Sequence, residues 1–305
     1  MSPSAALHDP VFRVYLVIVI GVLLGAGIVL AALQVVFRIQ LGSVRKTYRS
    51  WLWLAPLAAV FVFGGRVSFI CGVTVLGILG AKEFLRASEL DSDWLLSGVV
   101  YLGIVSVGVV NLFKRDLESL LVLVPALILI VPIVRNRFDG ELRKVSLGML
   151  AFVLLGWMWG HLGSLANSLQ PYGYICFLIF ATETTDVAAF TFGKMFGRHP
   201  LRSEISPRKT WEGALGGLAV ALALPWLLRF SFPFFGTTQL ILAGLIVGIG
   251  SVLGDLSLSV IKRDLGVKDW GATLPGHGGV LDRIDSLIFV VPLFLQMTEY
   301  YYPGR

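Results

Sequence analysis

Apolar runs separated by short polar connections recur along almost the whole chain. A helix needs about 20 apolar residues to cross ~30 Å of hydrocarbon, and most of the runs approach that length. The pattern predicts ten helical segments, at residues 14–37, 51–64, 67–81, 94–113, 117–134, 145–167, 171–190, 213–230, 238–260 and 284–302. We therefore expect an all-α fold, a polytopic integral membrane bundle with about nine or ten transmembrane segments.

Three of these runs need separate comment. The run at 14–37 follows a polar leader and exceeds the 7–15 apolar residues of a cleaved signal, so we expect a retained anchor. The runs at 51–64 and 67–81 are short for a full crossing and are divided by Gly64, Gly65 and Arg66. They are expected to form a tilted or re-entrant pair.

Composition supports the membrane interpretation. Hydrophobic residues make up 56% of the 305 residues and charged residues only 14%, whereas a soluble domain carries about a quarter charged residues. No stretch is left over for a separate soluble domain, so the chain is expected to be one integral membrane unit. Cys71 and Cys176 lie inside apolar runs without Cys or His spacing, which argues against a disulfide framework and a zinc site.

The basic residues predict an orientation. A net charge of +6 could indicate a nucleic-acid partner, but in a membrane protein it is first a topology signal, and no nucleic acid is expected. Of the 25 Lys and Arg residues, 19 fall in the connections 38–50, 82–93, 135–144, 191–212 and 261–283. The positive-inside rule places these five connections in the cytoplasm and both termini on the opposite side of the inner membrane.

Carboxylates enter the apolar runs only after residue 170. We therefore expect residues 1–170 to form transmembrane helices that support the site, and residues 171–305 to form the catalytic region. A carboxylate in a span costs several kcal/mol unless it is paired, hydrated or metal-bound. The candidates are Glu183, Asp186, Asp255, Asp282 and Asp285. The predicted topology brings the four aspartates to one membrane face, and an all-oxygen cluster suits Mg²⁺. The alternative is that Asp282 and Asp285 only stabilise a helix N-terminus while they pair with Arg283.

Two basic connections accompany these carboxylates. In the first, Ser206 or Thr210 could cap the helix that follows, and its amide groups together with Lys209 would favour a phosphate. The second contains Lys262, Arg263 and Lys268, and it places His277 among glycines, where it cannot pack as a core residue. For the first connection taken alone, the alternative is an ordinary helix cap together with basic residues that only set the membrane orientation.

The second connection resembles the signature of the phosphatidate cytidylyltransferase (CDP-diacylglycerol synthase) family. That signature reads Ser-x-apolar-Lys-Arg, four residues, Lys-Asp-x-small, two residues, apolar-Pro-x-His-Gly-Gly-apolar-x-Asp-Arg-apolar-Asp, and every specified position is met from Ser259 to Asp285. The family has a second conserved pattern, Asp-x-x-Ala-aromatic-x-x-Gly-Lys followed by Ser-Pro-x-Lys-Thr-x-Glu-Gly. Residues 186–194 and 206–213 of this chain match it. The resemblance covers residues 171–295. Glu183 stands in a triplet that differs from that of many members, which leaves its role open.

The resemblance implies an enzyme that joins CTP to phosphatidic acid and releases pyrophosphate. It implies Mg²⁺ held by Asp255, Asp282 and Asp285, and it admits K⁺ as a second cation. Lys262, Arg263 and His277 are then assigned to phosphates in the catalytic centre, and Asp186, Ser206, Lys209, Thr210 and Lys268 to substrate binding. The alternatives are a cytidylyltransferase for another lipid phosphate and an ion-coupled transporter. A homodimer is a candidate assembly.

Overall fold

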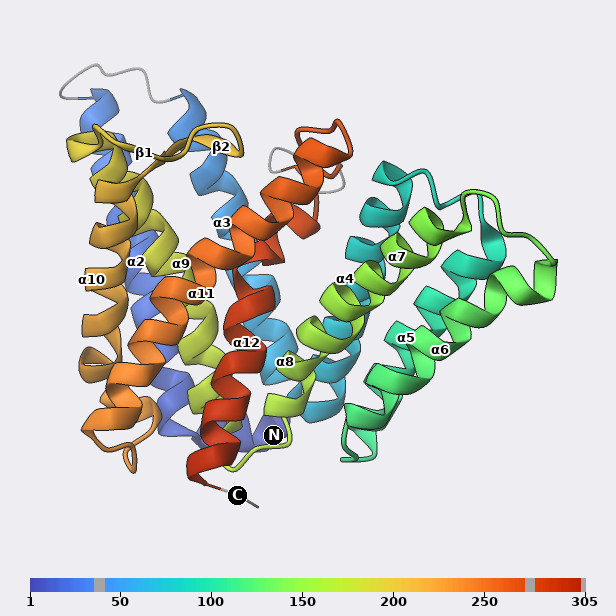
Figure 1. Ribbon diagram of the computed structural model, residues 1–305. Helices are drawn as coiled ribbons and strands as arrows, with labels where there is room; N and C mark the ends of the chain where they lie inside the picture. Colours follow the sequence, from blue (N-terminus) through green and yellow to red (C-terminus); the bar gives the residue numbers. More distant parts are fainter. Residues whose placement is uncertain (36–41, 272–277, 303–305) are drawn as a thin grey trace.

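The structure is a computed structural model that describes residues 1–35, 42–271 and 278–302. It is a bundle of helices with one β-hairpin at one end (Figure 1). In chain order the elements are α1 Pro3–His8, α2 Pro10–Val35, α3 Gly42–Phe63, α4 Gly65–Ala87, α5 Trp94–Leu112, α6 Glu118–Arg135, α7 Glu141–Phe152, the π-helix η1 Val153–Met158, α8 Trp159–Leu165, α9 Pro171–Phe196, β1 Pro200–Arg202, β2 Ser206–Thr210, α10 Trp211–Leu227, the 3₁₀ turn η2 Arg229–Ser231, α11 Thr237–Asp264 and α12 Leu281–Tyr301.

The predicted membrane architecture is confirmed. Within the described ranges, seven helical segments are long and apolar enough to cross a membrane. Shorter apolar helical stretches lie at Trp51–Phe63 and Trp211–Leu227. The chain is therefore a polytopic helical membrane protein. The β-hairpin, at 200–202 and 206–210, was not expected from the hydrophobic pattern.

The two runs expected to be short belong to longer helices. α3 has 22 residues and α4 has 23, and at 1.5 Å per residue α4 is roughly 35 Å long. Polar residues that end an apolar run, such as Lys82, do not end the helix. The turn between the two helices uses Gly65, whose φ is +88° and against which the backbone of Ser2 packs.

From α2 onward the long helical segments alternate in direction, with α7, η1 and α8 forming one segment. The chain ends and the basic connections therefore lie at opposite ends of the bundle. In Figure 1 both termini lie at the lower end, and the hairpin and the last turns of α4, α6 and α11 lie at the upper end. This is the alternation that the distribution of Lys and Arg predicts.

The second half of the bundle is closely packed and touches the first half. α9 packs against α10, α10 against α11, and α11 against α12, while α4 and α8 contact α12. At Gly254 of α11 a Cβ atom would collide with the backbone oxygen of Asp285 and approach that of Ser286 to 3.1 Å. The glycine therefore lets α11 and α12 touch backbone to backbone beside the acidic residues.

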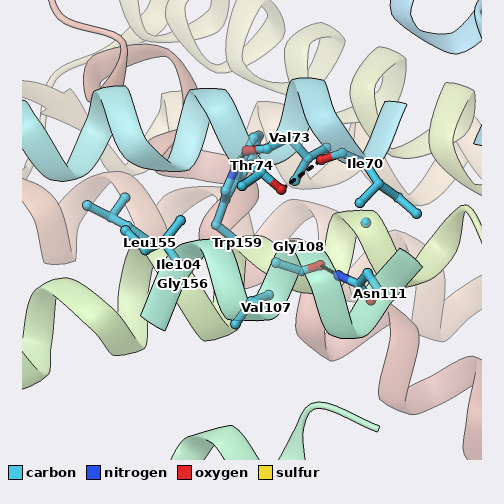
Figure 2. Close-up of a pocket in the computed structure, with 12 residues that line it drawn as sticks. Ile70, Val73, Thr74, Ile104, Val107, Gly108, Asn111, Leu155, Gly156 and Trp159 are labelled. Carbon is cyan, nitrogen blue, oxygen red and sulfur yellow. Dashed lines mark hydrogen bonds between the residues drawn. The ribbon is translucent and has the colours of Figure 1, made fainter. Parts of the chain in front are cut away.

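A small cavity lies in the first half, between α4, α5 and the η1–α8 segment. Figure 2 shows it lined by apolar side chains such as Ile104 and Trp159, with Thr74 Oγ1 donating a hydrogen bond of 2.8 Å to the carbonyl of Ile70. Its volume of about 10 Å³ holds at most one water molecule. It is a packing defect between helices and too small for a substrate.

Candidate active site

The hairpin end of the bundle brings together the two basic connections that the sequence singled out. β1 and β2 pair antiparallel with Pro200 opposite Thr210, and α10 starts directly after β2. Thr210 Oγ1 accepts a hydrogen bond of 3.2 Å from Gly213 N–H, so the expected helix cap at Thr210 is confirmed. Ser206 instead starts β2.

The end of the hairpin reaches α11 through an ion pair. Lys209 Nζ lies 2.5 Å from Asp255 Oδ2, and both side chains are about one-third exposed. Ser259, one turn further along α11, donates a hydrogen bond of 3.2 Å to Asp255 Oδ1. A lysine from the first connection thus meets a carboxylate of the signature region, as a shared site requires.

A second ion pair joins the end of α11 to the start of α12. Lys262 Nζ lies 2.8 Å from Asp282 Oδ1, and both side chains are largely buried. Asp282 Oδ2 accepts hydrogen bonds from the backbone N–H groups of Trp270 at 3.2 Å and Gly279 at 3.1 Å. The connection between α11 and α12 carries most of the family signature and is called the signature loop below. Asp282 holds its two ends together, because it binds residues near both of them.

The third group of contacts joins α12 to α9. Ser286 Oγ donates a hydrogen bond of 2.8 Å to Asp186 Oδ2, and Ser286 N–H donates one of 2.8 Å to Asp285 Oδ1. Asp285 is close enough to Asp186, Asp255 and Lys262 to interact with them electrostatically. Four elements thus converge on one set of charges. Ser286 was not predicted, although its place directly after Asp285 in an apolar helix was a usable signal.

The helix-capping alternative explains part of this arrangement. Asp282 lies in the first turn of α12, and its contact with Gly279 N–H is a local cap. A cap does not explain the pairing of Asp282 with Lys262, nor the positions of Asp255 and Asp186. The two roles coexist at Asp282.

The predicted Mg²⁺ ligands have the right chemistry but are not gathered around one point. Their donors are all carboxylate oxygens, which Mg²⁺ prefers. Among the residues that the structure describes, no group of three or more His, Cys, Asp or Glu side chains could hold a metal ion. Asp255 and Asp282 each carry a lysine where a cation would lie.

The remaining predicted residues are placed less centrally. Arg263 is exposed, and its Nε donates a hydrogen bond of 3.3 Å to the carbonyl of Ile205 in the hairpin, so it joins the two connections to each other. Lys268 is exposed. His277 lies outside the described residues. Glu183 lies one turn before Asp186 on α9, near enough to Asp186 and Arg283 to interact electrostatically.

Glu83, a second residue at this end of the bundle, was also not predicted. Glu83 of α4 is 6% exposed and accepts hydrogen bonds from the backbone at the start of α12. Residues 1–170 were expected only to support the catalytic region, so Glu83 was not singled out. Its place beside Lys82 at the end of an apolar run gave no signal of burial.

The match to a family model decides the family. The model, described as the cytidylyltransferase family, matches residues 45–301. The chain belongs to the cytidylyltransferase family. As a member it is a nucleotidyltransferase, and the match starts early enough to include α4 and Glu83.

Individual relatives agree with this family. The chain is 33% identical over 261 residues to the phosphatidate cytidylyltransferase of Staphylococcus aureus (strain COL), covering 81% of this chain and 96% of the relative. It is 36% identical over 254 residues to the Staphylococcus saprophyticus protein of that name, covering 81% and 96%. It is also 31% identical over 269 residues to the uncharacterized protein YnbB of Escherichia coli (strain K12), covering 85% and 88%.

Proposed function

We propose that this cytidylyltransferase transfers the cytidylyl group of CTP to phosphatidic acid, giving CDP-diacylglycerol and pyrophosphate. The observation that carries the proposal is the convergence of the Lys209–Asp255 and Lys262–Asp282 pairs at one end of a membrane bundle. The staphylococcal relatives are named as phosphatidate cytidylyltransferases, which supports the choice of substrates.

The reaction is an in-line displacement at the α-phosphorus of CTP. A phosphate oxygen of phosphatidic acid forms the new P–O bond, and the bond to the β-phosphate breaks as pyrophosphate leaves with its electron pair. The nucleophile is an anion at neutral pH, so the site needs no strong general base. Its task is to position two polyanions and neutralise their repulsion, which lysines at a low-dielectric membrane edge do strongly.

We assign Lys209 and Lys262 to the CTP phosphates, with Arg263, Lys268 and His277 as further phosphate contacts. The two lysines are the basic groups placed directly on the acidic residues of the site. Asp186 and the hairpin residues Ser206 and Thr210 are assigned to substrate positioning.

The proposal includes Mg²⁺ bound by Asp255, Asp282 and Asp285, with K⁺ as a candidate second cation. When bound, the divalent ion neutralises phosphate charge and orients the leaving group. The lysines that now pair with Asp255 and Asp282 would then be free to bind phosphates. We expect no turnover in excess EDTA and recovery on addition of Mg²⁺; full turnover in EDTA would refute this assignment.

Access for the lipid is proposed from the side of α9. Asp186 is exposed, and next to it on the same helix Val187 and Phe190 are 60% and 70% exposed. An acyl chain lying against these apolar side chains would bring its phosphate towards Asp186 and the lysines. CTP would enter from the hairpin end, which we place in the cytoplasm, with the protein in the inner membrane.

Residues 171–305 are proposed to carry the chemistry, with residues 1–170 as supporting helices, and a homodimer stays a candidate assembly. The supporting role is not passive, because α4 and α8 contact α12.

The proposal is tested with the purified full-length protein in detergent, given labelled CTP, Mg²⁺ and one acceptor at a time. We expect a CMP-containing lipid with phosphatidic acid and little with other lipid phosphates, such as an isoprenoid phosphate. Preference for another acceptor would keep the family chemistry and overturn the substrate. No product with any acceptor would overturn the function.

A further inference from the structure

The carboxylate of Glu83 binds the start of α12. Its Oε1 accepts a hydrogen bond of 2.9 Å from Val280 N–H, and its Oε2 accepts one of 2.9 Å from Leu281 N–H. Val280 is the N-cap and Leu281 the first residue of α12. The first N–H groups of a helix have no partner within the helix, and a negative charge there is favoured by the helix dipole. Glu83 therefore caps α12 from a helix almost 200 residues away in sequence.

The signature loop is shaped to admit this carboxylate. A Cβ atom at Gly279 would lie 2.5 Å from Glu83 Oε2, and one at Gly271 would lie 3.2 Å from Glu83 Oε1. Two glycines of the signature thus leave room for a side chain of α4.

The residue after Glu83 holds the other end of the same loop. The Phe84 ring stacks on Trp270 with centroids 5.4 Å apart and planes 23° apart, and both residues are buried. Trp270 N–H and Gly279 N–H both donate to Asp282 Oδ2. The turn of α4 that contains Glu83 and Phe84 therefore fixes the two loop residues that bind Asp282.

We infer that Glu83 is a positioning residue for the transfer reaction: by holding the first turn of α12 it sets the carboxylate of Asp282 in the site. The inference rests on the proposed function. Glu83 acts through backbone amides and through Asp282, and it touches no substrate. A displacement of about 1 Å in such a group can cost ~100-fold in rate.

The test uses Glu83→Gln, Asp282→Asn and the double variant in the full-length protein, with Glu89→Gln as matched control. Glu89 is exposed and lies on the connection just after α4. The amide of Gln cannot accept both N–H groups, so we expect kcat/KM for CTP to fall about 10–100-fold. In the double variant the loss should stay close to that of Asp282→Asn alone, because both changes disturb the same carboxylate. The control should keep the wild-type kcat/KM.

A second readout does not depend on activity. Hydrogen–deuterium exchange of a peptide covering residues 278–290 should rise in Glu83→Gln, while exchange of α10 peptides stays near wild type. If Glu83→Gln does not fold, Gly279→Ala replaces it, because its methyl group displaces the Glu83 carboxylate. Its control is Gly98→Ala, at a position with open space around it.

The outcomes separate this inference from the proposed function. Wild-type kcat/KM in Glu83→Gln, unchanged exchange at 278–290, or losses that multiply in the double variant would each overturn the positioning role. A wild-type protein that makes no CMP-lipid would overturn the proposed function, while increased exchange would still support the structural link from Glu83 to α12.

Discussion

At the scale of single residues, the site is a set of charges that satisfy one another. Lys209 neutralises Asp255, and Lys262 neutralises Asp282. A buried or half-buried charge is costly unless it is paired, so these pairs keep the site stable until substrates arrive. If Lys209 and Lys262 bind the CTP phosphates as proposed, both pairs exchange partners when CTP binds.

The first prediction concerns the acidic partners. Asp282→Asn and Asp285→Asn should each lower turnover about 100-fold or more with the protein still inserted, because losing a ligand charge weakens the binding of the proposed Mg²⁺ and leaves the phosphate repulsion uncompensated. Turnover is measured in purified protein, and Asp264→Asn, an exposed residue at the end of α11, serves as control. If both variants kept more than about a tenth of the wild-type rate, helix capping alone would explain the two residues.

At the scale of elements, the ends of the helices carry the specific contacts. Asp93 caps α5 by accepting a hydrogen bond of 3.1 Å from Leu96 N–H. The same carboxylate accepts two hydrogen bonds of 2.6 Å from Arg135 at the end of α6. Hydrophobic periodicity predicts where such helices lie, but the contact between their ends depends on how the helices pack. The sequence alone could not reveal it, and the same holds for Glu83.

The Asp93 contact predicts a pH dependence of stability. Hydrogen bonds from Arg135, with a smaller one from Leu96 N–H, lower the pKa of Asp93 below its ordinary value of 3.8. A lowered folded-state pKa stabilises the protein above that ordinary value, and the stabilisation is lost as pH falls through the folded-state pKa. Asp93→Asn should therefore destabilise the protein by about 1 kcal/mol at pH 7, because it removes the charge that Arg135 binds.

The measurement is the thermal midpoint of the wild type and Asp93→Asn between pH 7 and pH 3. The gap between them should shrink below about pH 4. Asp91→Asn, at an exposed neighbouring position, should leave the midpoint unchanged. A gap that stays constant over the whole range would show that ionisation of Asp93 does not contribute.

At the scale of the whole molecule, sequence patterns predicted the architecture because a membrane restricts the choices. Ten apolar runs predicted ten helical segments, and the charge distribution predicted which helix ends lie together. The hairpin escaped prediction because its residues are polar and the strands very short. The lengths of α3 and α4 were underestimated because helices continue past the apolar core into polar residues.

Orientation is tested by labelling single cysteines in a background without Cys71 and Cys176. Cysteine in place of Ser203, in the hairpin, should resist an impermeant thiol reagent outside intact cells and react once the membrane is opened. Cysteine in place of Thr237, at the start of α11, should react from outside. Both positions are exposed. Labelling of position 203 from outside would place the lysines away from cytoplasmic CTP and would favour the transporter alternative.

The central claim is that the hairpin and the signature loop together transfer CMP to phosphatidic acid. The most direct measurement compares CTP labelled at the α-phosphorus with CTP labelled at the γ-phosphorus, using reconstituted wild-type protein and Asp282→Asn. We predict that the α label appears in the lipid and the γ label in pyrophosphate, and that both products are nearly lost in the variant. The γ label in the lipid, the α label only in free nucleotide, or undiminished lipid labelling by the variant would contradict the account.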